Sequence, residues 1–125
     1  MKTILLIEDD AGFRKMLRTA FVIDGFSVRE AANGYDALSL LDQQAFDGVV
    51  LDLGLPLVDG LSVLADINQK TPLHNIAEHG PSRPAVVVVT GSSHVEAVDL
   101  DVDSLLRKPV TADYVVATVR KYLRQ

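Results

Sequence analysis

The sequence predicts an α/β fold with a doubly wound, five-stranded parallel sheet. Short, continuously apolar runs alternate along the chain with longer stretches whose apolar residues recur at helical spacing. A strand that is buried on both faces is apolar throughout, and such strands are typical of parallel sheets covered by helices. Right-handed crossovers between successive strands then place helices on both faces of one sheet.

The first part of the chain predicts three strands and two helices. TILLI is apolar throughout and bounded by acids, and apolar residues recur at helical spacing after Ala11. The expected inward stripe of this helix is Phe13, Met16, Leu17, Ala20 and Phe21. Asn33, with Asp36 three residues later, resembles a capping box that starts a second helix. The expected strands cover residues 3–7, 26–31 and 47–53.

The second part of the chain predicts two more strands, at 84–90 and 103–109. The segment PAVVVVT has four valines in a row, and β-branched residues favour strands. Asp59 is expected to cap a third helix that buries Leu61, Leu64 and Ile67. Thr111 is expected to cap the last helix, and the prolines and glycine of 70–83 predict a long exposed loop.

The composition indicates one ordinary globular domain over residues 1–125. Hydrophobic residues make up 48% of the 125 residues, charged residues make up 23%, and cysteine is absent. A net charge of −5 argues against direct binding to nucleic acid, because phosphate binding needs a basic surface. We expect no membrane segment and a cytoplasmic location, since the apolar runs are short and no secretion signal is recognisable.

Polar side chains follow four of the predicted strands at the point where each strand ends. They are Glu8, Asp9, Asp10, Asp52, Thr90 and Lys108. The carboxyl ends of parallel strands meet at one edge, which is where ligands bind in open α/β sheets. Clustered carboxylates need a cation, and oxygen ligands without sulfur or imidazole favour Mg²⁺.

This set of residues fits phosphoryl transfer. A carboxylate beside Mg²⁺ can act as the nucleophile and form an aspartyl phosphate, while a lysine offsets charge on the transferred group. Each residue alone also has a structural interpretation: the acids as loop and cap residues, Thr90 as a structural hydroxyl, Lys108 as a solvated cation. Agreement among four separate strand ends favours the catalytic interpretation.

Four segments resemble the receiver domain of two-component response regulators, and the chemotaxis regulators in particular. They are ILLIEDD, VVLDLGLPLVDG, VVVVTG and LLRKPV, and they follow the family's order over essentially the whole chain. The resemblance implies a flavodoxin-like sheet of strand order 2-1-3-4-5. It also implies phosphorelay signalling, in which a sensor histidine kinase or a histidine phosphotransfer protein donates the phosphoryl group and a downstream protein target receives the signal.

The resemblance also implies a role for each site residue. Asp52 is the expected phosphoacceptor, and Thr90 and Lys108 complete the catalytic set. The expected Mg²⁺ ligands are Glu8, Asp9, Asp52 and the backbone carbonyl of Gly54. Asp10 is then an additional acid that caps the following helix. The bond between Lys108 and Pro109 is expected to be cis.

The sequence departs from the family in two places. Leu105 stands where the family has an aromatic residue that couples to the switch threonine. The interval from Asp52 to Thr90 is 38 residues, about two helical turns longer than usual, and that from Thr90 to Lys108 is 18, about one turn shorter. The first difference falls in the loop 70–83, and the second predicts a shortened fourth helix. Both features indicate an unusual output surface.

These residues favour one of three functions. The favoured one is a receiver that catalyses its own phosphorylation and dephosphorylation on Asp52 and acts mainly as a signalling switch. The alternative is a degenerate receiver, a protein-interaction module of the same fold that works without phosphorylation. A flavodoxin-like enzyme or a phosphatase is disfavoured, because acids replace the phosphate loop after the first strand and Asp52 is followed by Leu53-Gly54 rather than by a second aspartate two residues on.

Overall fold

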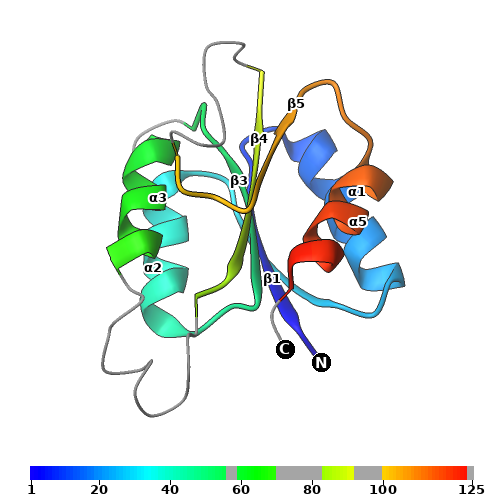
Figure 1. Cartoon of the computed structure of the whole chain (residues 1–125), viewed down its shortest axis with the longest axis horizontal. Coiled ribbons are helices and arrows are strands. Elements are labelled where there is room, and N and C mark those ends of the chain that lie inside the picture. Colours follow the sequence, from blue (N-terminus) through cyan, green and yellow to red (C-terminus); the bar gives the residue numbers. More distant parts are fainter. Residues whose placement is uncertain (56–58, 70–82, 92–99, 124–125) are drawn as a thin grey trace.

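The chain folds into a parallel sheet of order β2-β1-β3-β4-β5 between two layers of helices. The computed structural model describes residues 1–55, 59–69, 83–91 and 100–123. The elements are β1 Thr3–Ile7, α1 Ala11–Ile23, β2 Ser27–Ala31, α2 Gly34–Gln43, β3 Gly48–Asp52, α3 Gly60–Gln69, β4 Ala85–Thr90, β5 Ser104–Arg107 and α5 Ala112–Tyr122. Helices α2 and α3 cover one face of the sheet, and α1 and α5 cover the other (Figure 1). The predicted fold class and strand order are confirmed.

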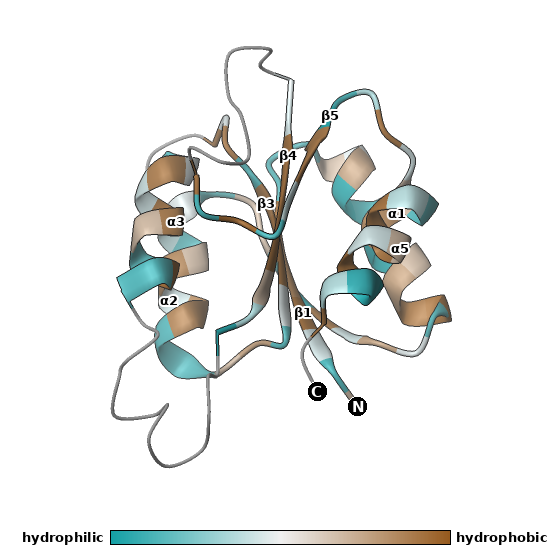
Figure 2. Ribbon diagram, viewed as in Figure 1, coloured by the Kyte–Doolittle hydropathy of each residue, from teal (hydrophilic) through white to brown (hydrophobic). Residues whose placement is uncertain are grey.

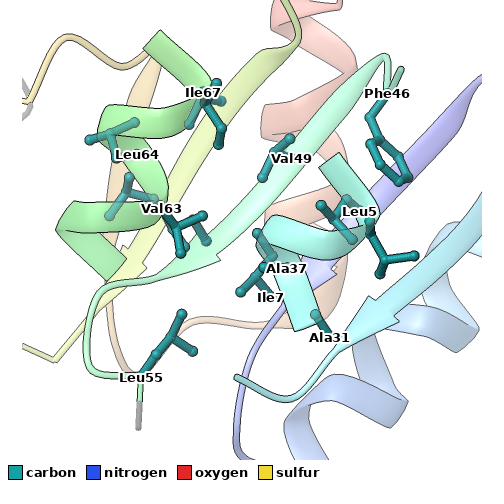
Figure 3. Close-up of a cluster of buried hydrophobic side chains, with 14 residues drawn as sticks. Leu5, Ile7, Ala31, Ala37, Phe46, Val49, Leu55, Val63, Leu64 and Ile67 are labelled. Carbon is teal, nitrogen blue, oxygen red and sulfur yellow. The ribbon is translucent and has the colours of Figure 1, made fainter. Parts of the chain in front are cut away.

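The sheet separates two hydrophobic cores. Alternate residues of β1 point to opposite faces, so that Leu5 and Ile7 join the core under α2 and α3, while Ile4 and Leu6 join the core under α1 and α5. Figure 3 shows the first of these cores, and Figure 2 shows hydrophobic strands between helices that carry both hydrophobic and hydrophilic residues. All residues of β3 and β4 are buried, which explains why both strands are apolar runs.

The expected caps begin four of the helices. The side chains of Asp10, Asn33 and Thr111 accept a backbone N–H from the first turns of α1, α2 and α5. Asp59 accepts the Ser62 N–H at 2.8 Å at the start of α3. Each cap satisfies a backbone donor that the helix itself leaves without a partner. It also fixes the residue at which the helix begins after the preceding strand.

Two predicted core positions are wrong. Met16 and Leu61 are 59% and 53% exposed, while Val63, which the prediction for the third helix omitted, is buried. Successive helical residues are rotated by about 100°, so a residue one step from the centre of the buried stripe already faces outward when no neighbouring element covers it.

Two predictions lie outside the described residues. The long loop 70–83 is described only at its last position, and the shortened helix expected in residues 92–102 falls largely on undescribed positions. Within the described part of the chain, no helix has both the length and the apolar character needed to cross a membrane.

Candidate functional site

The turn after β1 is held by hydrogen bonds that bury one acid and expose the next. Glu8 is 1% exposed, and its backbone N–H donates to the carbonyl of Ala31 on β2 at 3.1 Å. Its side chain accepts the Asp10 N–H at 3.1 Å, and Asp10 in turn accepts the Phe13 N–H at 3.0 Å. Asp9 between them is exposed, as suits a group that meets a ligand from solvent. Asp10 therefore acts as the cap that its position predicted.

Asp52 ends β3 and is 7% exposed. Its Oδ1 accepts the backbone N–H of Gly54 at 3.0 Å, and its Oδ2 lies 3.4 Å from the Lys108 Nζ. The turn that follows is tightly packed against α3, because Gly60 donates its N–H to the Leu53 carbonyl at 3.2 Å. A Cβ on Gly60 would lie 2.4 Å from the Leu53 Cα, so glycine is required for this close approach.

Lys108 brings a positive charge between the two buried acids. Its Nζ lies 3.0 Å from Glu8 Oε1 as well as 3.4 Å from Asp52. The backbone N–H of Lys108 donates to the Thr90 carbonyl at 2.8 Å, and the ammonium lies 5.4 Å from the centre of the Phe13 ring. The peptide bond from Lys108 to Pro109 is cis, as predicted.

Three carboxylates converge at this edge of the sheet, at the upper side of Figure 1, where the strands end. Glu8, Asp9 and Asp52 each offer an oxygen atom, and these atoms lie within 4.8 Å of one another. All of the donors are hard oxygens, which is the ligand chemistry that Mg²⁺ prefers. The family resemblance implied the backbone carbonyl of Gly54 as a further ligand. Gly54 lies two residues from Asp52 and donates its backbone N–H to the Asp52 carboxylate.

The proton affinities of these groups reflect their crowding. Burial raises the pKa of Glu8 from 4.5 to about 7, assisted by the neighbouring Asp52 and opposed by Lys108. Burial also pushes the pKa of Asp52 upward, but the Gly54 N–H, Glu8 and Lys108 outweigh it and hold that pKa below its usual value. Burial lowers the pKa of Lys108, yet Glu8 and Asp52 together hold it above its usual value. A raised pKa of Glu8 beside a lowered pKa of Asp52 is the arrangement expected of two close acids that share a single cation.

Thr90 is the last residue of β4 and is 3% exposed. It lines a cavity of 430 Å³ together with Asp52, Gly54, Asp59 and other residues of the neighbouring turns. Leu105, by contrast, is half-buried and packs against the core under α2 and α3. The structure thus places all six predicted site residues at the ends of β1, β3, β4 and β5, whereas Leu105 lies within β5 and packs against the core.

Comparison with known proteins gives the class of this domain. The family model of the response regulator receiver domain matches residues 4–120, so the chain belongs to the receiver domains of two-component systems. It is 31% identical to the response regulator MprA of Mycobacterium sp. (strain KMS) and 30% identical to a probable transcriptional regulator, ycf27, of Porphyridium aerugineum. Both alignments cover 98% of this chain but 50% and 48% of the relatives, so the chain spans about half their length.

Solved structures have the same fold. The response regulator TrrA of Thermotoga maritima, solved in complex with Mg²⁺ and BeF, is 26% identical with a TM-score of 0.80 and covers 98% of this chain and 100% of its own. The chemotaxis regulator CheY4 of Vibrio cholerae has a TM-score of 0.81 at 19% identity over 98% and 99% of the two chains. The acidic cluster of Glu8, Asp9 and Asp52 matches the magnesium site of receiver domains.

The sequence did not reveal every residue that supports the site. Arg14, on α1, donates to the backbone carbonyl of Glu8 at 2.8 Å, although it lies outside the inward stripe expected of this helix. The need for glycine at position 60 follows from the approach of α3 to β3, and the contact of Phe13 with Lys108 joins α1 to the segment after β5. Such contacts depend on how the elements pack and have no local sequence signal.

Proposed function

We propose that this domain accepts a phosphoryl group on Asp52 from a phosphohistidine of a sensor histidine kinase or a histidine phosphotransfer protein. The observation that carries the proposal is the placement of Asp52 within 4.8 Å of two further carboxylates and 3.4 Å from the Lys108 ammonium. A buried carboxylate that stays ionised beside a fixed cation is equipped to act as a nucleophile toward phosphorus.

The chain's own groups have distinct tasks in this reaction. The Asp52 carboxylate forms the new O–P bond while the N–P bond of the donor breaks, and the imidazole leaves with the electron pair. Lys108 offsets charge on the transferred phosphoryl oxygens, and the Thr90 hydroxyl donates to one of them. Dephosphorylation ends the signal: water attacks the phosphorus, the bond between the Asp52 oxygen and phosphorus breaks, and inorganic phosphate leaves the restored Asp52 carboxylate.

Mg²⁺ is the metal that this donor set fits, and Asp9, Asp52 and the Gly54 carbonyl would hold it, with Glu8 as a further acid of the site. When bound, the ion neutralises charge that develops on the phosphoryl oxygens. The elevated pKa of Glu8 is consistent with a cation at this site, because the buried acids lack enough positive charge to be ionised together. TrrA of Thermotoga maritima, which was solved with Mg²⁺ and BeF, supports it by similarity.

Beryllofluoride, which mimics a bound phosphoryl group, tests the proposal. The protein is titrated with Mg²⁺ and beryllofluoride and followed by amide NMR, because a chain without tryptophan offers no intrinsic indole signal. We expect Mg²⁺-dependent shifts at Glu8, Asp52, Gly54 and Thr90, and none in an Asp52→Asn variant. An unchanged spectrum of the wild-type protein would favour the alternative, an interaction module that works without phosphorylation.

A further inference from the structure

Both backbone polar groups of Glu8, its N–H and its carbonyl, form hydrogen bonds to other parts of the chain. Its N–H donates to the carbonyl of Ala31 at 3.1 Å. Its carbonyl accepts from the Nη1 of Arg14 at 2.8 Å. Because the peptide group between Glu8 and Asp9 carries the second of these contacts, the direction in which both carboxylates leave the main chain depends on it.

Arg14 is in turn oriented by Glu30 on β2. The Arg14 Nε donates to Glu30 Oε1 at 3.3 Å, and the Arg14 side chain is only 21% exposed. Glu30 pairs with Leu6 in the register between β1 and β2, so its position is set by the sheet. A planar guanidinium with several fixed donors can span a carboxylate and a carbonyl at once.

We infer that Arg14 is a positioning residue for the magnesium site. The bridge from Glu30 through Arg14 to the Glu8 carbonyl holds the Glu8–Asp9 peptide so that both carboxylates face Asp52. This inference rests on the proposed function, since it gives Arg14 a task in the same site. Groups that orient metal ligands typically change metal affinity by about 10- to 100-fold when they are lost.

Arg18 provides a matched control on the same helix. Its Nη1 donates to the other oxygen of Glu30 at 2.8 Å, and its side chain is 49% exposed. Within the part of the chain that the structure describes, Arg14 donates to the Glu8 carbonyl, whereas Arg18 donates to Glu30 and not to that carbonyl. The two arginines therefore have the same charge, lie on the same helix and pair with the same acid. They differ in the hydrogen bond to the Glu8 carbonyl, which only Arg14 of the two donates.

Lysine variants separate geometry from charge. An Arg14→Lys variant keeps the positive charge, but it carries its donors on one nitrogen instead of on the separate Nε and Nη1 that contact Glu30 and the Glu8 carbonyl. We expect it to pair with the Glu30 carboxylate, since hydrogen bonds between two charged groups are the stronger ones. The Glu8 carbonyl then loses its donor. Arg18→Lys keeps the same charge and leaves the Glu8 contact in place.

The experiment measures two quantities by amide NMR at equal ionic strength. The amide shift of Asp9 reports directly on the hydrogen bond to the preceding carbonyl, and it should move in Arg14→Lys and stay unchanged in Arg18→Lys. The Kd for Mg²⁺ should rise about tenfold in Arg14→Lys and stay within about twofold in Arg18→Lys. The pair Arg14→Gln and Arg18→Gln repeats the comparison with one charge removed from each.

The outcomes separate this inference from the proposed function. Equal Mg²⁺ affinities and equal Asp9 shifts for the Arg14 and Arg18 variants, in a wild-type protein that binds Mg²⁺, would overturn the positioning role alone. A wild-type protein that shows no response to Mg²⁺ would overturn both. A smaller Kd for Arg14→Lys than for Arg18→Lys would also contradict the inference.

Discussion

Glu8 should make the magnesium-free domain more stable in mild acid than at neutral pH. Its pKa is about 7 in the folded chain against 4.5 for an unperturbed glutamate, so the folded state binds the proton more tightly. Stabilisation from this group is complete below pH 4.5 and is lost as the pH rises through 7. A tenfold change in proton affinity is worth about 1.4 kcal/mol, which gives about 3 kcal/mol in total and about 2 kcal/mol between pH 5 and 7.5.

Other shifted groups of the site leave this range undisturbed. The lowered pKa of Asp52 adds stability that is lost only as the pH falls below its usual value of 3.8, and the raised pKa of Lys108 adds stability that is lost only above 10.5. A Glu8→Gln variant removes the Glu8 proton and keeps every other titratable residue of the chain, so the difference between the two proteins isolates Glu8.

The assay is urea unfolding followed by circular dichroism at pH 5 and 7.5 in the presence of EDTA. We expect the free energy of unfolding of the wild-type protein, relative to Glu8→Gln, to fall by about 2 kcal/mol across that interval. Saturating Mg²⁺ should abolish the fall, because a cation favours the ionised acid. An identical pH dependence for the two proteins would refute the crowding of acids on which the site rests.

Three further predictions concern the scaffold, and urea unfolding measures each of them. Gly60→Ala should destabilise the domain by about 2–3 kcal/mol, because its Cβ would meet the main chain after β3, whereas Gly91→Ala, which has open space, should change stability by less than about 1 kcal/mol. Arg120 and Asp24, joined at 2.6 Å between α5 and the end of α1 but both exposed, should show a coupling energy of about 0.5–1 kcal/mol in a double-mutant cycle, and a value near zero would mean that the pair does not tie the helices. Asn33→Ala should cost about 1 kcal/mol through the lost cap of α2, and an unchanged stability would show that the helix start is held by packing alone.

The strands and helix starts could be predicted from the sequence because their causes are local. β1 is bounded as predicted, since both of its faces are buried and its apolar run ends where the acids begin. The cap residues Asn33 and Thr111 act through hydrogen bonds within the next three positions, which is a distance that a sequence pattern can resolve. The predicted positions of Met16 and Leu61 failed because exposure depends on which neighbouring element covers a helix flank.

The candidate site could be predicted because parallel strands bring their carboxyl ends to one edge. Glu8, Asp52 and Lys108 are distant in the chain and meet there, with the Lys108 Nζ 3.0 Å from Glu8 and 3.4 Å from Asp52. The sequence could not predict that Arg14 supports the site, because that role depends on Glu30, which lies 16 residues away and is brought near by the pairing of β1 with β2. Support of this kind depends on sheet register rather than on a motif.

The central claim is that Asp52 accepts a phosphoryl group, and chemical trapping tests it most directly. The protein is incubated with Mg²⁺ and phosphoramidate, a small donor with the N–P bond of phosphohistidine, and the aspartyl phosphate is then reduced with borohydride to homoserine. We predict homoserine at position 52 in the wild-type peptide map, dependent on Mg²⁺ and absent from Asp52→Asn. Homoserine at Asp9 or Asp59 instead, or at no position at all, would contradict the account.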